Sequence, residues 1–146
     1  MLKTTLIAGA TALFCALPAF AEITIQDAYA RASSPMAKSG AAFLVIHNSG
    51  DAADRLVAVS SEAAARTELH THLEGENGIM RMVHVEEGFD LPANGMIAMQ
   101  RGGQHVMLMG LTAPMEQGAT VTVTLTFETA GDAVVEVPVD LDRQDH

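Results

Sequence analysis

The sequence lacks the residues on which much of the metal and redox chemistry of exported proteins depends. It has a single cysteine, Cys15, no tryptophan, and only 4% aromatic residues. Cys15 lies in an N-terminal segment that we expect to be removed, so the mature chain has no thiolate metal ligand and no disulfide framework. A blue-copper electron-transfer centre is thereby excluded, because it requires a cysteine sulfur.

Basic residues are also scarce. Eight Lys and Arg stand against 18 Asp and Glu, which gives a formal net charge of −10. This balance argues against nucleic acid and anionic membrane surfaces as partners. The sequence contains neither a Ser/His/Asp signature nor a His-Glu-x-x-His motif, so an enzyme is not expected.

Residues 1–21 have the pattern of a secretory signal peptide. Lys3 supplies the positive start, an apolar run extends from Leu6 to Leu17, and Ala19-Phe20-Ala21 is a small-x-small cleavage site. We therefore predict cleavage after Ala21 and export to the periplasm. Phe14 precedes Cys15 where a lipoprotein signal has a small residue, so lipidation is not expected. The mature domain, residues 22–146, has no later apolar run of membrane length and is expected to be a soluble monomer.

The mature chain has the pattern of a series of short strands. The clearest lies where Val121, Val123, Leu125 and Phe127 alternate with threonines, which indicates a half-buried strand. The other predicted strands cover residues 23–31, 40–47, 55–60, 67–73, 79–85, 96–100, 104–110 and 133–139, with one helical turn at 61–66. About eight or nine short strands separated by turns predict a single all-β domain, a sandwich or a barrel.

Three clusters of histidine and methionine fall within about forty residues. They are His70 and His72, then Met80 and Met82, then His105, Met107 and Met109. Strand side chains alternate with a period of two, so each cluster places its His and Met side chains on one face. Imidazole with thioether is a soft, neutral donor set that suits Cu(I), whereas zinc sites seldom use thioethers.

The turn between the first two clusters decides whether they share a face. A two-residue turn on Asn77-Gly78 pairs His72 with Val83 and separates the His and Met rows. A three-residue loop, Glu76 to Gly78 with Gly78 left-handed, pairs His72 with Met82 instead. We predict the three-residue loop.

Other His and Met residues receive structural interpretations. His47 is expected to be structural or solvated, and Met36 to be an exposed loop residue. Met96, Met99 and Met115 are expected to fill the core. Carboxylates beside His70, such as Glu68, could accept hydrogen bonds from ligand histidines.

Several motifs resemble the periplasmic copper chaperone family PCu(A)C, a DUF461-type domain. They include Glu68-Leu69-His70, Met80-Arg81-Met82 and, most specifically, the run from Gly102 to Leu111. The resemblance implies a cupredoxin-like, Greek-key β-sandwich. It also implies copper ligands on His70, Met82, His105 and Met107, in the family's His-x10-Met-x21-His-x-Met pattern. The gaps here hold 11 and 22 residues, so His72, Met80 and Met109 are substitute ligands.

The resemblance further implies Cu(I) delivery to the dinuclear copper centre of cytochrome c oxidase subunit II. Delivery would proceed directly or with a thiol-disulfide protein of the Sco type, and Cu(II) could bind at a secondary site. Two alternatives stay open: a copper-buffering or tolerance protein, and a β-sandwich interaction module whose Met face is a contact patch.

Overall fold

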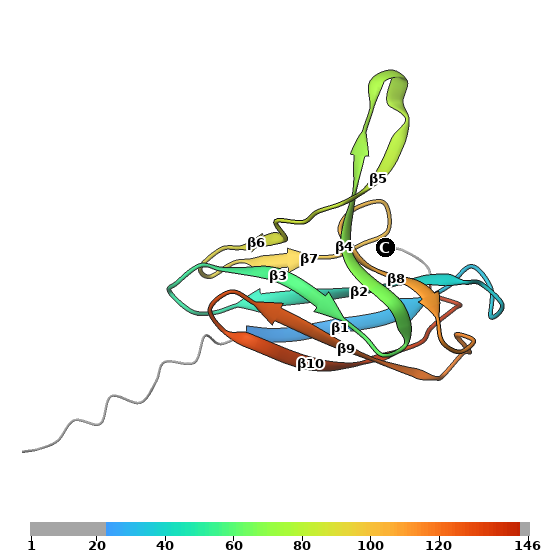
Figure 1. The fold of residues 1–146 in the computed structure, drawn as a ribbon. Helices are drawn as coiled ribbons and strands as arrows, with labels where there is room; N and C mark the ends of the chain where they lie inside the picture. The colour runs from blue at the N-terminus through green and yellow to red at the C-terminus, as the bar shows by residue number, and fades with distance from the viewer. Residues whose placement is uncertain (1–22, 144–146) are drawn as a thin grey trace, which may run out of the picture.

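The computed structural model describes residues 23–143 as a β-sandwich of two packed sheets (Figure 1). One sheet has the strand order β1-β2-β8-β4-β5, with β7 also paired to β2, and the other has the order β10-β9-β3-β6. The strands are β1 (Ile23–Arg31), β2 (Ser39–Asn48), β3 (Asp54–Ser60), β4 (Ala64–Glu74), β5 (Met80–His84), β6 (Phe89–Leu91), β7 (Met96–Ala98), β8 (His105–Leu111), β9 (Thr120–Phe127) and β10 (Gly131–Pro138), with a 3-10 turn at Glu76–Gly78.

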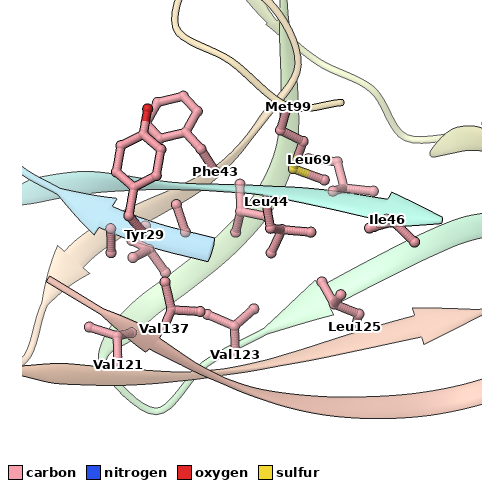
Figure 2. Close-up of a cluster of buried hydrophobic side chains, with 14 of the residues drawn as sticks. Tyr29, Phe43, Leu44, Ile46, Leu69, Met99, Val121, Val123, Leu125 and Val137 are labelled. Carbon is pink, nitrogen blue, oxygen red and sulfur yellow. The ribbon is translucent and has the colours of Figure 1, made fainter. Parts of the chain in front are cut away.

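The core forms between the inner faces of the two sheets. In β9 the period-two pattern holds throughout, so Val123 and Leu125 are fully buried while the alternating threonines are not. Leu44 and Ile46 of β2 lie across from them, and Leu69 of β4 joins the same cluster (Figure 2). This burial of apolar surface is the main force that holds the sheets together.

The outer face of the larger sheet carries a second, smaller apolar group. Phe43 of β2 points away from the core, yet it is buried, because the ring of Tyr29 stacks on it at 5.1 Å between centroids. The ring of His105 on β8 lies 6.0 Å from Phe43 on the opposite side. These aromatic rings therefore pack side by side on one part of the outer face.

The predicted fold class is confirmed, as are Met99 and Met115 as buried core residues. Two expectations are wrong. The helical turn at 61–66 does not form, because Ala64 and Arg66 pair with β8, and ladder pairing outweighs the weak propensity of so short a segment. Met96 is 53% exposed, since it sits on the outer face of β7 opposite His47.

The signal peptide and its cleavage site lie outside the described residues. Within residues 23–143, no helix is long and apolar enough to cross a membrane.

Asp54, at the start of β3, anchors the turn between β9 and β10. Its Oδ1 accepts a hydrogen bond from the amide of Thr129 at 2.9 Å, and its Oδ2 accepts one from Ala130 at 3.0 Å. Burial by itself raises the pKa of this carboxyl, but the bonds from Thr129, Arg55 and Ala130 outweigh it, and the pKa lies below its ordinary value.

Replacing Asp54 by alanine is expected to destabilise the protein by about 2 kcal/mol, because the amides of Thr129 and Ala130 lose the carboxylate that accepts their part-buried hydrogen bonds. The lowered pKa stabilises the fold above the unfolded pKa near 4, and this contribution is lost as the pH falls further. Urea denaturation at pH 7 and pH 3 measures both effects. Asp90→Ala, which removes an exposed partner of Arg55, is the matched control and should change stability by less than about 0.5 kcal/mol. An Asp54→Ala variant as stable as that control would contradict the prediction.

Candidate metal centre

The β4–β5 hairpin has the three-residue loop predicted from the sequence. The Gly75 amide donates to the Ile79 carbonyl at 2.7 Å, which closes a loop of Glu76, Asn77 and Gly78. Gly78 is left-handed, with φ of 73°, and Asn77 also has a positive φ. His72 therefore lies opposite Met82, and His70 lies opposite His84. The His and Met rows share one face, as expected.

β4 pairs with two different strands along its length, and this pairing brings the third cluster, on β8, to the same face. Its first part pairs with β8, where Glu68 lies opposite Met107 and His70 opposite His105. Its last part pairs only with β5, and this hairpin extends beyond the two packed sheets (Figure 1). The outer face thus carries a row of three histidines, His105, His70 and His84, on neighbouring strands.

A pocket of about 690 Å³ opens on this face beside the hairpin. Two imidazoles, from His72 and His105, and two thioethers, from Met82 and Met107, line it. The remaining lining residues come from β1, β2 and the loops beside them and from the turn before β8: Arg31, Ala32, Ser33, Ser39, Gly40, Ala41, Phe43, Arg101 and Gly102. Three strands distant in the sequence therefore bring four soft donors to one cavity.

One backbone carbonyl orients both histidines of the pocket. Nδ1 of His72 lies 3.3 Å from the Gly103 oxygen, and Nδ1 of His105 lies 3.0 Å from the same atom. A carbonyl can only accept, so each Nδ1 must carry the proton and each Nε2 keeps its lone pair. The centroids of the His72 and His105 rings are 5.4 Å apart. This arrangement fixes the tautomer that a metal-binding histidine requires.

Burial disfavours the charged form of His105. The side chain is 2% exposed, and burial lowers its pKa below the ordinary value. The bond to Gly103 raises the pKa, and the neighbouring His72 and His70 lower it further, so the net shift is downward. A neutral imidazole is the form that binds metal, so less proton competition has to be overcome at His105 than at an ordinary histidine.

His70 has a different set of partners. Its Nε2 lies 2.9 Å from Oε2 of Glu68, whose other oxygen accepts from Nε of Arg66. The hydrogen bond from His70 is the largest cause that lowers the pKa of Glu68; burial raises it, and the charges of His84 and Arg66 lower it further. Glu68 is therefore an anionic acceptor, and Nε2 of His70 donates to it. Nδ1 of His70 is buried without a hydrogen-bond partner.

Of the four ligands that the family resemblance indicated, three meet in the pocket: Met82, His105 and Met107. The fourth, His70, lies next to His105, at 5.8 Å between ring centroids, but is not among the lining residues. The substitute His72 does line the pocket. Met80 is exposed near the hairpin end, and the sulfur of Met109 accepts from Arg66 at 3.6 Å instead. The ligand assignment itself stays a prediction.

Some features of the site could not be inferred from the sequence. Side-chain periodicity gives no information on the Gly103 carbonyl, which is a backbone atom before β8. Arg31 and Arg101 lie outside the His and Met clusters, and only the fold brings them to the same pocket. Among residues 23–143, no group of three or more His, Cys, Asp or Glu side chains is arranged to hold a metal ion. The secondary Cu(II) site stays a prediction.

The fold and the site define a β-sandwich protein with a pocket of mixed His and Met donors on one sheet face. Residues 23–139 match the model of the LpqE-like family, described as "Putative lipoprotein LpqE-like". The chain belongs to this family, a PCu(A)C or DUF461 group, and the resemblance seen in the sequence is confirmed.

Individual relatives agree with this assignment. The chain is 38% identical over 99 residues to "Putative lipoprotein Lxx21020" of Leifsonia xyli subsp. xyli (strain CTCB07), and the match spans 68% of this chain and 59% of that protein. The Cu(I) form of DR1885 from Deinococcus radiodurans, solved in solution, is 30% identical with a TM-score of 0.63, covering 91% of this chain and 85% of that one. The copper-bound PCuAC domain from PmoF2, 24% identical with a TM-score of 0.67 and coverage of 84% and 96%, shares the fold.

Proposed function

We propose that this protein is an exported metallochaperone that carries Cu(I) in the pocket of β4, β5 and β8. The observation that supports it most directly is the donor set, two oriented imidazoles and two thioethers in one cavity. A soft, neutral set of this kind favours Cu(I) over harder divalent ions. Family membership and the Cu(I) form of the Deinococcus relative also support a Cu(I)-binding function.

Several residues at the pocket have distinct roles in holding this cargo. The Gly103 carbonyl holds His72 and His105 with Nε2 unprotonated. The ring of Phe43 lies next to His105, and Tyr29 stacks on Phe43. Met82, on the hairpin, is 46% exposed and is accessible to an incoming acceptor. Such a site can exchange donors one at a time, as a carrier requires and an electron-transfer or catalytic centre does not.

Anaerobic titration of the mature protein with Cu(I) against a chromophoric chelator tests this proposal. Tight one-to-one binding is expected. Absence of binding above that of the chelator would refute the carrier function, and the exposed apolar side chains of the hairpin, Leu73, Ile79, Met80 and Met82, would then favour an interaction module. Self-association that is indifferent to copper and chelator would support that second function.

The two histidines of β4 are expected to behave differently. His72→Gln removes an imidazole that lines the pocket and should weaken Cu(I) binding by about 10- to 100-fold, as changes around metal ligands do. His70→Gln should cost less, because Nε2 of His70 is already engaged with Glu68. The same chelator competition measures both, with His47→Gln on β2 as a control outside the site.

A larger loss in His70→Gln than in His72→Gln would reverse the assignment. It would place the buried Nδ1 of His70 on the metal, with Glu68 as its carboxylate support. The family-based choice of His70 would then stand.

Copper delivery to cytochrome c oxidase subunit II, directly or through a Sco-type protein, is the finer part of the proposal. Mixing Cu(I)-loaded protein with the apo copper domain of that subunit tests it. Transfer in a defined stoichiometry supports delivery, whereas metal retained against the apo domain and against a Sco-type protein indicates a buffering or tolerance protein. Export is supported by the lipoprotein name of the Leifsonia relative, of whose length the match covers about three fifths, and a periplasmic location is part of the proposal.

A further inference from the structure

The proposed copper pocket is larger and more positively charged than a bare Cu(I) ion requires. Its volume of about 690 Å³ is in the range of pockets that take small organic ligands, and a single ion fills little of it. The four His and Met donors occupy only part of the lining. The remaining surface comes from β1, β2 and the turn before β8.

The charge of this remaining surface is opposite to that of the protein. The chain has 18 acidic and only 8 basic residues, yet Arg31 and Arg101 both line the pocket and no described lining residue is acidic. Arg31 is held in place, since its Nη1 donates to the Arg143 carbonyl at 3.0 Å. Two arginines that line a common cavity contribute positive charge there, which disfavours a lone cation and favours an anion.

The donor set strengthens this conclusion. Two imidazoles and two thioethers are neutral, so Cu(I) bound to them keeps its full positive charge beside two arginines. A monovalent anion that binds with the metal cancels that charge. Because Cu(I) is soft, the anion that matches it best is a thiolate sulfur, and neighbouring arginines also favour the thiolate form of a thiol.

We infer that this pocket takes a thiolate together with Cu(I), with Arg31 and Arg101 supplying the positive charge that holds the anion beside the metal. The inference rests on the proposed function and specifies how the cargo leaves. A thiol RSH gives its proton to water and forms a Cu–S bond, and one copper–thioether bond breaks. Copper remains Cu(I), and no electrons are transferred.

The thiolate could belong to a free thiol or to a cysteine of an acceptor protein, and the experiment separates these sources. Cu(I)-loaded protein is titrated anaerobically with the neutral peptide acetyl-Gly-Gly-Cys-Gly-Gly-amide carrying a fluorescent label, read by anisotropy, and with glutathione as its competitor. A serine version of the peptide reports any binding that needs no thiolate. Stronger binding of the peptide indicates a protein cysteine, and stronger binding of glutathione indicates a free thiol.

The arginines are tested in the same assay. The double variant Arg31→Gln/Arg101→Gln should bind the cysteine peptide about tenfold more weakly or worse, and the salt dependence of wild-type binding should largely disappear. Its Cu(I) affinity without thiol should be unchanged or higher. Arg66→Gln and Arg81→Gln, on the neighbouring strands β4 and β5 but outside the pocket, are matched controls. Thermal unfolding checks that each variant is folded.

The outcomes distinguish this inference from the function on which it rests. Normal Cu(I) uptake with thiolate binding that is equal in the double variant and in the controls would overturn the inference alone, as would equal binding of the serine peptide. Failure of the wild-type protein to take up Cu(I) would refute the proposed function and the inference together.

Discussion

Replacing Met107 by leucine is expected to lower the Cu(I) affinity by about 100-fold, because it removes a thioether from the pocket without changing side-chain volume much. Met109→Leu is the matched control. Met109 lies two residues further along β8, on the same face and equally half-buried, but its sulfur accepts from Arg66 instead of lining the pocket. The control should stay within about twofold of wild type in the chelator competition.

The comparison within one strand separates metal ligation from packing. Both substitutions keep an apolar side chain of similar size, so both should change stability by less than about 1.5 kcal/mol. Equal losses of affinity in the two variants would show that the sheet face, rather than a specific sulfur, governs binding. A loss in Met109→Leu alone would move the ligand to the substitute that the sequence also allowed.

Acidification is expected to weaken Cu(I) binding by more than about 30-fold between pH 7.5 and pH 5. Each histidine ligand must be unprotonated to bind, and at pH 5 an imidazole of ordinary pKa near 6.5 is protonated about 30 times more often than not. Two such ligands give a limit of about 1,000-fold. The loss should fall short of that limit, because burial lowers the pKa of His105 and proton competition there begins at lower pH.

Affinity measured at half-unit pH steps against a chelator of known pH dependence tests this expectation. His72→Gln should lose part of the slope, since it removes one competing proton. The fold itself should persist over this range, because the hydrogen bonds from Thr129, Arg55 and Ala130 hold the pKa of Asp54 below its ordinary value and this anchor stays ionised. An affinity that is flat from pH 7.5 to pH 5 would exclude histidine ligation.

Much of the fold could be predicted from local patterns. The alternation in β9 and the turn residues around each strand led to an all-β domain, and the ten strands of the structure agree with that class. The errors have a common cause. At residues 61–66 a local preference for a helical turn competed with pairing to a distant strand, and the burial of Met96 depended on which face of β7 is covered, which local patterns do not determine.

The β4–β5 hairpin shows how much of the site the spacing of His and Met residues in the sequence can predict. Period-two alternation alone places His70 and His72 on one face, and Met80 and Met82 on one face. Whether the His face and the Met face coincide depends on whether the loop has two or three residues. Asn77-Gly78 is compatible with both loop lengths. The left-handed Gly78 and the pairing of His72 with Met82 resolve it in favour of the three-residue loop.

The sequence by itself determined the donor chemistry of this protein: no thiolate in the mature chain, three His and Met clusters in strand phase, and a soft neutral set. Only the tertiary structure decided which of these donors meet. Strand pairing places His70 between His105 and His84 with its Nε2 on Glu68, whereas His72 joins His105 at the Gly103 carbonyl and lines the pocket. The physical reason is that the period-two alternation determines on which face of its own strand each side chain lies. The distances between side chains on different strands depend instead on the strand register and on how far the hairpin extends. They also depend on backbone groups, such as the Gly103 carbonyl, which the side-chain pattern does not reveal.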